Sequence, residues 1–249
     1  GIKLTYPSIK LISWSLDDMY AWHNRSLYYT LGLKYYDTVF TVKSYNVREL
    51  KLIGAKEVKY LHQAYSKKHH KPCNSCDEIK DKVDVIFIGH GERERFESLN
   101  YLAKNGIKVT VYGAAWHKKE FNNYHNNLQI NDYPLLGEAY SNALSCSSIN
   151  LCFLRKINRD LHTSRSLEIP ACGGFMMAEQ TQEHAELFKE DKEAVFFNND
   201  KELLAKVQYY LKNKTERIKI SKAGYDRCVN SNYSYDSMLN KILEGMSNV

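Results

Sequence analysis

Proline is scarce in this sequence and long apolar runs are missing. The 249 residues include only 4 prolines, and no apolar run approaches the ~18 residues of a membrane-spanning helix. The first residues lack the charged, apolar and small-residue regions of a secretory signal peptide. We therefore expect a folded cytoplasmic chain without a transmembrane segment. Its 43% hydrophobic residues suffice for one large domain or two modest ones, each with a core.

The chain also lacks a strong excess of one charge. Its net charge is +6, and the lysines are scattered apart from small groups such as Lys67-Lys68 and Lys118-Lys119. We therefore expect no nucleic-acid partner, whereas an anionic cofactor or peripheral contact with a membrane surface is compatible with this charge. The 19 tyrosines stand at helical and strand spacing, which favours packing over stacking on bases or sugars.

Complete nucleotide-binding motifs are missing too. A buried strand is predicted over residues 83–89, and the Gly89-His90-Gly91 turn that follows it resembles a phosphate loop. Glu94 stands where the third glycine of GxGxxG would be, and there is no Walker motif. The turn is either a tight strand-to-helix connection or a ligand contact. The absent GxGxxG makes a dehydrogenase a poor hypothesis.

Only one pair of cysteines has metal-binding spacing. Cys73 and Cys76 form a CxxC, and His69 and His70 precede it, so four potential metal ligands lie within eight residues. Zinc sites usually pair two such hooks, and the sequence has no second one. We therefore favour a flexible interdomain linker over a metal site in this segment.

Three other cysteines lie in apolar stretches. Buried cysteine behaves as a small hydrophobic residue, and disulfides are rare in the cytosol. We expect small buried side chains of a reduced cytosolic protein at Cys146, Cys152 and Cys172.

Strand-like and helix-like segments alternate in two arrays, a pattern that builds parallel sheets. In the first array Ser44 is expected to cap the second helix. The first array has predicted strands over 9–16, 37–42 and 57–62, and helices over 24–36 and 44–54. The second has strands over 83–89, 108–112, 129–131, 148–153, 174–178 and 194–197, and helices over 90–106, 136–146, 201–211, 216–229 and 235–244.

These arrays predict an α/β protein with two Rossmann-like βα domains. A partial N-terminal domain covers residues 1–70, and a polar linker with Pro72 covers 71–82. A nucleotide-binding domain follows over 83–233. The terminal helix, 234–249, is expected to pack back toward the N-terminal part, with four apolar side chains turned inward: Met238, Leu239, Ile242 and Leu243.

The stretch 161–190 carries the strongest site signal. It predicts a helix, a turn at Gly173-Gly174, a strand and then a polar loop containing His184. Arg165 and Glu168 lie one helical turn apart and so share a face. An arginine fork suits a phosphate, and an ionised carboxylate accepts hydrogen bonds from two sugar hydroxyls. Together they predict a sugar-nucleotide site at the carboxyl ends of the strands. The alternative is a surface ion pair on one helix.

The stretch INLCFLRKINRDLHTSRSLEIPACGGFMMAEQTQEHAELFKEDKEAVFF resembles the C-terminal part of the CgeB-like (spore maturation protein-type) glycosyltransferases. Those proteins are similar to the wider retaining glycosyltransferases of the GT-B fold. The resemblance extends less sharply over VDVIFIGHGERERFESLNYL and over SWSLDD through VKYLHQA. It implies two Rossmann-like domains, the first of them incomplete. It also implies metal-independent transfer, without a cofactor, of a sugar from a nucleoside-diphosphate donor to a glycan, protein or small-molecule acceptor.

The resemblance also implies roles for individual residues. The family has two acids separated by seven residues before an A-C-G turn, and Asp160 and Glu168 have that spacing. Glu168 would grip the ribose, Arg165 would face the donor phosphates, and Asp160, an aspartate where glutamate is usual, would lie nearer the transferred sugar. The other expected donor contacts are Thr163, Ser164, Gly89, His90, Gly91, Gly173 and His184.

The acceptor side is less defined. Asp17 and Asp18 follow the first predicted strand, and their position makes Asp18 a candidate catalytic base, with a capping or surface acid as the alternative. Family members carry more strands before SWSLDD, so the chain is either a fragment or a reduced form. A second hypothesis is therefore a non-catalytic nucleotide- or glycan-binding module derived from a glycosyltransferase.

Overall fold

The chain forms two compact units. The computed structural model describes residues 2–76 and 83–247. Unit 1 comprises residues 1–63, 155–161 and 236–249, and unit 2 comprises residues 64–154 and 162–235. The first predicted boundary thus lies a few residues late, because the segment from 64 onward belongs to unit 2. Among the described residues, no helix is both long and apolar enough to cross a membrane.

Unit 1 is built on a small parallel sheet with the order β1-β2-β3. Val39 of the middle strand pairs with Val58 of the third and lies in a small core with Leu33, Leu50 and Ala55. The strands are β1 (Ile12–Ser15), β2 (Thr38–Thr41) and β3 (Val58–Tyr60). The helices are α1 (Ile2–Thr5), α2 (Leu27–Gly32), η1 (Leu33–Tyr35), α3 (Asn46–Leu52) and η4 (Lys156–Asn158).

Unit 2 contains a six-stranded parallel sheet with the order β6-β5-β4-β7-β8-β9. The chain first steps outward from β4 to one edge and then returns to β7 and steps to the other edge. The carboxyl ends of β4 and β7 therefore form the topological switch point at which such sheets bind ligands. The strands are β4 (Val85–Ile88), β5 (Val109–Tyr112), β6 (Leu128–Asn131), β7 (Ile149–Cys152), β8 (Met176–Glu179) and β9 (Val195–Phe197).

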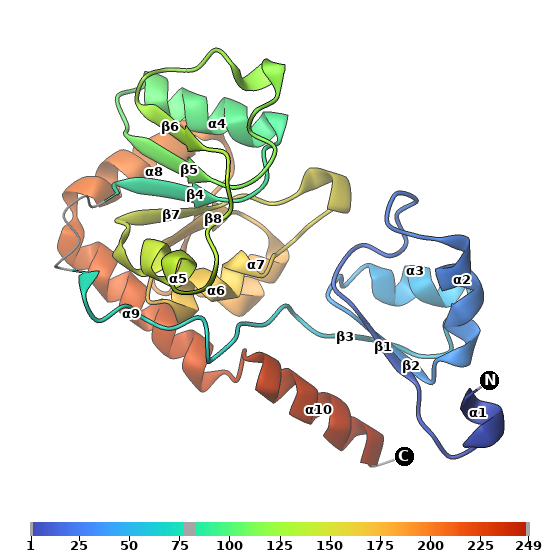
Figure 1. Cartoon of the computed structure of the whole chain (residues 1–249). Helices are drawn as coiled ribbons and strands as arrows, with labels where there is room; N and C mark the ends of the chain where they lie inside the picture. The colour runs from blue at the N-terminus through green and yellow to red at the C-terminus, as the bar shows by residue number, and fades with distance from the viewer. Residues whose placement is uncertain (1, 77–82, 248–249) are drawn as a thin grey trace. The chain divides into compact units, whose positions relative to one another are not determined.

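Helices cover both faces of this sheet (Figure 1). Val85 and Phe87 point to a core shared with α4 and α8, whereas Ile86 and Ile88 point to a core shared with α5, α6 and α7. This alternation follows from the two-residue period of a strand, and it explains the uninterrupted apolar run. The helices are α4 (Arg93–Lys104), η3 (Lys119–Phe121), α5 (Gly137–Cys146), α6 (Arg165–Ala171), α7 (Gln182–Leu187), α8 (Asp200–Lys212) and α9 (Lys214–Asn230).

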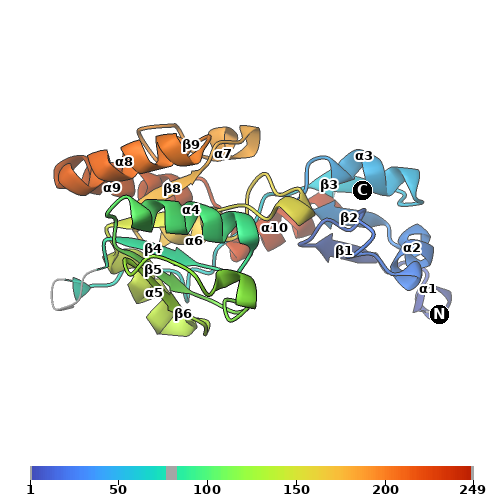
Figure 2. The same ribbon diagram turned by 90° about the horizontal axis from the view of Figure 1, so that it is seen from above.

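Close packing of α9 on the rest of unit 2 depends on a glycine. A Cβ atom at Gly224 would lie 2.4 Å from the carbonyl oxygen of Glu193 and 3.5 Å from Pro170 of α6. Helix α9 runs beside both α6 and α8 (Figure 2). Because Gly224 has no side chain, α9 can pack closely against α6, the helix that carries Arg165 and Glu168.

Three expectations for unit 1 need correction. The predicted helix over 24–36 is shorter, because α2 begins after the Ser26 cap and continues into η1. Ser44 does not cap α3, whose N-cap is Tyr45 with no side-chain hydrogen bond. In α10 (Tyr235–Ser247), Met238 and Ile242 are buried as predicted, but Leu239 and Leu243 are exposed. The helix therefore buries a narrower stripe than its apolar sequence suggested.

Two loops of unit 2 meet through glycines at the carboxyl end of the sheet. A Cβ atom at Gly113 would lie 1.9 Å from the carbonyl oxygen of Gly89. The same carbonyl accepts a 2.9 Å hydrogen bond from Nε1 of Trp116, and a Cβ atom at Gly91 would lie 2.4 Å from the Ala115 carbonyl oxygen. These glycines therefore fix the shape of the turn after β4.

We predict that Gly113→Ala destabilises the protein more than Gly106→Ala does. Both glycines have positive φ, +150° and +86°, but only Gly113 meets another atom, whereas nothing lies within 4 Å of the Cβ position at Gly106. The left-handed backbone should cost about 1 kcal/mol at each site, and the clash should add about 1–3 kcal/mol at Gly113. Urea unfolding followed by circular dichroism measures the difference. Equal losses at the two sites would contradict this account of the turn.

Candidate functional site

The candidate site lies at the switch point of the unit 2 sheet. The Gly89-His90-Gly91 turn leaves the carboxyl end of β4, and α6 begins after the neighbouring strand β7. Since the two strands are parallel neighbours, both turns lie at the same edge of the sheet. The structure thus brings together the two segments that the sequence marked separately.

Helix α6 ends where the sequence predicted. Gly173 has a φ of +73°, and its amide donates to the Pro170 carbonyl at 2.8 Å. The amide of Gly174 donates to the Ile169 carbonyl at 3.0 Å, and a Cβ atom at Gly174 would lie 2.6 Å from the Leu144 carbonyl oxygen. The double glycine therefore closes the helix, and its tight packing leaves no room for a side chain at the second position.

Glu168 is held by groups from outside its own helix. The hydroxyl of Tyr140, from α5, donates to its carboxylate at 2.6 Å. Nε2 of His70, from the segment before the CxxC, lies 3.9 Å from the other carboxylate oxygen, and the His70 and Tyr140 rings meet edge to face. The Glu168 side chain is 14% exposed. One oxygen of this acid accepts a hydrogen bond, and the other lies near His70 without one among the described residues.

The surroundings of this carboxylate shift the pKa values of its neighbours. Burial, and then the negative charge of Glu168, raise the pKa of Tyr140 well above its ordinary value. The same two causes raise the pKa of Tyr235. Burial lowers the pKa of His70, and the attraction of Glu168 only partly offsets it. Tyr140 and Tyr235 are therefore uncharged near neutral pH, and the lowered pKa of His70 favours its neutral form, so these three neighbours do not neutralise Glu168.

Arg165, at the start of α6, is not paired with Glu168. Its Nε atom is buried and has no hydrogen-bond partner among the described residues, which also offer its guanidinium no carboxylate within ion-pair distance. The electrostatic influence of its charge reaches Tyr140 and Cys152. The alternative of a surface ion pair between Arg165 and Glu168 is therefore wrong, and the arginine keeps donor capacity for a ligand.

A buried polar network supports the beginning of α6. The Ser166 hydroxyl accepts from the Thr163 amide at 3.0 Å and lies 2.8 Å from Nε2 of His184. Nδ1 of His184 lies 2.7 Å from the carbonyl oxygen of Glu179. Beside them, Nδ1 of His162 lies 2.5 Å from the Glu183 carboxylate, and both side chains are buried. These hydrogen bonds hold the turn before α6 in one orientation.

The predicted loop around His184 is wrong in its local structure. His184 lies in α7, whose N-cap Thr181 accepts from the His184 amide at 3.0 Å. It is fully buried, and burial lowers its pKa to about 4. His184 therefore acts on the turn through Ser166. Its expected contact with a donor stays a prediction, and this geometry does not favour it.

The remaining donor-contact candidates differ in exposure. His90 is exposed, and its carbonyl oxygen accepts a 3.1 Å hydrogen bond from the buried Arg95. Ser164 is half-buried and makes no side-chain cap for α6. Thr163 is buried, with its hydroxyl 3.8 Å from the Cys152 sulfur. Among these, His90 and Ser164 are the side chains that a ligand can reach directly.

Asp160 belongs to unit 1, where it forms a buried ion pair. Nζ of Lys43 lies 2.5 Å from its Oδ1, and the two side chains are 3% and 7% exposed. Its Oδ2 accepts from the Arg155 amide at 3.2 Å. A buried pair of this kind loses several kcal/mol if one partner is removed, because the other charge is left unpaired. The expected role of Asp160 at the transferred sugar stays a prediction.

Asp18, also in unit 1, accepts hydrogen bonds at both of its carboxylate oxygens. Its carboxylate accepts from Nε of Arg159 at 2.7 Å, from Asn46 at 2.9 Å and from the amides of Tyr20 and Ala21. Burial raises its pKa, but these hydrogen bonds outweigh burial and hold the pKa below its ordinary value. These are the contacts of a capping acid, the alternative named for this position. The catalytic assignment stays a prediction without support here.

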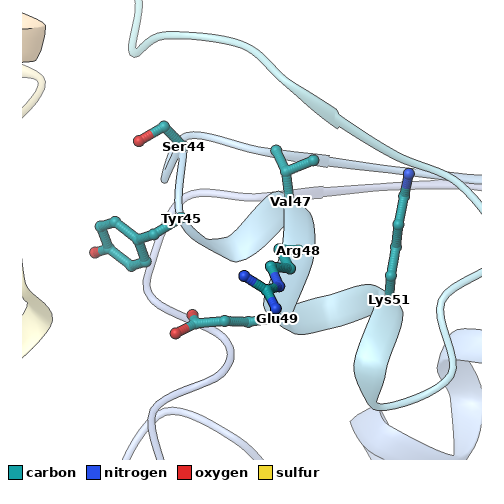
Figure 3. A pocket seen from close by; sticks show the side chains of 6 residues that line it. All are labelled: Ser44, Tyr45, Val47, Arg48, Glu49 and Lys51. Carbon is teal, nitrogen blue, oxygen red and sulfur yellow. The ribbon is translucent and has the colours of Figure 1, made fainter.

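Arg159 links the same acid to α3. It makes two 2.9 Å bonds to Glu49 and lies over the Tyr45 ring at 4.4 Å, with a left-handed φ of +50°. Figure 3 shows Tyr45 and Glu49 extending to the same side of the start of α3. Tyr45 and Glu49 are among the residues that line an open pocket of about 640 Å³. The lining residues are Ser44, Tyr45, Val47, Arg48, Glu49 and Lys51.

The prediction for Cys146 is wrong. This cysteine, the last residue of α5, forms a disulfide with Cys76, whereas Cys152 and Cys172 have free buried thiols as predicted. The amide of Cys73 donates to Ser145 of α5 at 3.0 Å. Residues 71–76 are therefore attached to unit 2, and the expectation of a flexible linker is wrong for them, whereas the rest of the predicted linker, 77–82, lies outside the described residues.

Sequence reasoning missed the residues that surround the acids. Tyr140 was one of 19 tyrosines assigned to packing, and His70 was considered only as a metal ligand. No sequence motif marks Lys43 or Arg159. Spacing along the chain could not reveal them, since each meets its acid across 28 or more residues.

Comparison with known proteins now defines the class. Residues 93–244 match the sequence profile of the family described as "Glycosyl transferase-like", and the chain belongs to that family. The match begins with α4, ends within α10 and includes both Arg165 and Glu168. A search of curated protein sequences gives no significant match.

Solved structures show the same fold. HepE from Anabaena in complex with UDP-glucose aligns with a TM-score of 0.71 at 11% identity, over 100% of this chain and 75% of that one. Sucrose-phosphate synthase from Thermosynechococcus elongatus aligns with a TM-score of 0.65 at 11% identity, over 88% of this chain. This chain spans 60% of that synthase, which is less than two thirds. The predicted α/β fold of the GT-B type is thereby confirmed.

We predict that His184 makes the protein less stable in acid. Its pKa is about 4 in the folded protein, against an ordinary value of 6.5, so the unfolded chain binds the extra proton between these pH values. Stability should fall as pH drops from 6.5 to 4, by up to ~3 kcal/mol from this group. Urea unfolding across this range should show a shallower loss for His184→Gln. The exposed His90→Gln variant should keep the wild-type slope, and an unchanged slope in His184→Gln would refute the prediction.

Proposed function

We propose that the switch point of unit 2 binds a nucleoside-diphosphate sugar and that the protein transfers this sugar to an acceptor. The observation that carries the proposal is that Arg165 and Glu168 share α6 yet form no ion pair with each other in the described part of the chain. HepE was solved with UDP-glucose, and the similarity of fold makes uridine compounds the first donors to test.

In this proposal Arg165 stabilises the leaving diphosphate. Negative charge accumulates on that group as the bond to the sugar breaks, so a fixed guanidinium favours the transition state over the ground state. The buried network behind α6 supports this role, because Ser166 and His184 hold the turn in one orientation. The arginine charge replaces a divalent cation, so we propose that transfer is metal-independent.

Glu168 holds the ribose. One carboxylate oxygen accepts from Tyr140, which leaves acceptor positions for sugar hydroxyls. Tyr140 and His70 fix the carboxylate without neutralising it, since the pKa of Tyr140 is raised and that of His70 is lowered. A charged acceptor that is largely buried discriminates strongly against a ligand that lacks the donor hydroxyls.

The finer assignments from the sequence stay proposals. We propose a CgeB-like branch within the family, a cytoplasmic location, Asp160 near the transferred sugar, and a glycan, protein or small-molecule acceptor. The Lys43 pair supports a fixed position for Asp160 within unit 1. The alternative function is a binding module without catalysis, derived from the same fold.

The ribose contact can be tested with a pair of ligands. We expect the wild-type protein to bind UDP about 10- to 100-fold more tightly than 2′,3′-dideoxy-UDP, because the charged hydrogen bonds are lost. Glu168→Gln should reduce this preference to a few-fold by weakening UDP binding alone. Isothermal titration calorimetry measures both constants. Glu138→Gln on α5, an exposed glutamate, is the matched control and should keep the full preference. An unchanged preference in Glu168→Gln would remove the ribose role.

The arginine role can be tested by turnover. Arg165→Gln should lower kcat for donor hydrolysis or transfer by about 10²- to 10³-fold, the usual effect of removing one group that stabilises transition-state charge. Arg93→Gln, which removes an exposed arginine at the start of α4, should leave kcat within a few-fold. The rate should be the same with a chelator present. If wild-type protein binds the donor but gives no turnover with any acceptor, the binding-module alternative holds.

A further inference from the structure

Three cysteines converge at the junction of α5 and the preceding segment. The Sγ atoms of Cys73, Cys76 and Cys146 all lie within 4.8 Å of one another, and the three residues are half-buried. Cys73 and Cys76 supply a CxxC, and Cys146 arrives from the end of α5, 70 residues after Cys76. We propose that, in the reduced protein, these three thiolates bind one zinc ion.

The geometry fits a zinc site. Zn–S bonds of about 2.3 Å place the sulfurs of a tetrahedral site ~3.8 Å apart, which is within the spread of this group. Zinc sites usually combine a CxxC hook with ligands from a distant segment, and Cys146 supplies the distant ligand that the sequence did not reveal. The half-buried position of the group lets a water molecule complete the fourth position of the ion.

The disulfide and the metal site are two states of the same sulfurs. Cys76 and Cys146 are joined by a disulfide in this structure, which leaves Cys73 as the free thiol. A dithiol reductant supplies two electrons and two protons, which turn the S–S bond into two thiols while the reductant itself becomes a disulfide. Zinc then displaces one proton from each of the three thiols.

The surroundings hold the three sulfurs in place. The Ser145 hydroxyl accepts from the Cys73 amide at 3.0 Å and donates to the Cys172 carbonyl at 2.6 Å, which ties the hook to the end of α6. The Ser141 hydroxyl donates to the His69 carbonyl. A cavity of about 380 Å³, lined in part by Cys73 and Ser141, gives an ion access to the group. These contacts hold Cys73 beside the end of α5, so that after reduction only the Cys76 and Cys146 sulfurs have to move apart to bind the ion.

Zinc titration of the reduced chain tests the proposal. The protein is reduced with a dithiol, freed of reductant under nitrogen and titrated against a chromophoric chelator. A parallel cobalt titration reports thiolate ligation by its charge-transfer absorption. The wild-type chain should bind one zinc ion, and Cys73→Ser should bind it at least ~10-fold more weakly, since loss of even an outer partner costs about 10- to 100-fold.

Two controls separate loss of a zinc ligand from loss of the fold. Cys73→Ser retains the Cys76–Cys146 disulfide, so its near-ultraviolet circular dichroism before reduction should match wild type and report a folded protein. Cys228→Ala removes a buried free thiol outside the group and should bind zinc as wild type does. If reduced wild type binds no zinc, or Cys73→Ser binds it equally well, the three cysteines form a disulfide only. Nucleotide binding, measured on the same samples, is independent of either result.

Discussion

The hydrogen bond from Tyr140 to Glu168 is the contact on which the candidate site depends. It joins α5 to α6. The Glu168 carboxylate is bonded to Tyr140 and makes no ion pair with Arg165 of the same helix in the described part of the chain. Without it, the simplest arrangement of Arg165 and Glu168 would be a local ion pair, which has little value on a helix surface and would occupy both groups. With it, the acid and the arginine stand one helical turn apart and form no ion pair with each other among the described residues, as the proposed donor site requires.

The strand order of the unit 2 sheet determines where this contact lies. Because β4 and β7 are parallel neighbours while their connections lead to opposite edges, the turns after them lie at the same end of the sheet. The glycines after β4 and β5 let two loops pack against each other through their backbones. Behind α6, the buried histidines keep the polar turn in one position. Rigid support of this kind matters for catalysis, since stabilisation of charge requires groups that do not have to reorganise.

Much of the fold could be predicted from the sequence, because alternating apolar runs and double glycines act locally. The strands and the stop of α6 at Gly173 follow from such signals. The contacts of the site could not be predicted in the same way, since Tyr140, His70 and Lys43 meet their acids only after the chain has folded. The same reason explains the error at Cys146, whose partner lies 70 residues away. The loop expected around His184 failed for a local reason, because the Thr181 cap starts a helix there.

The division of the chain gives the two units an unusual connectivity. The backbone passes from one unit to the other after residues 63, 154, 161 and 235. One protease cut at any single crossing therefore leaves the units covalently joined by the others. Neither unit corresponds to one continuous stretch of the gene, so splitting the coding sequence once cannot yield both of them whole. Expression of unit 2 alone would need the seven residues 155–161 replaced by a new connection from Leu154 to His162, three residues before α6.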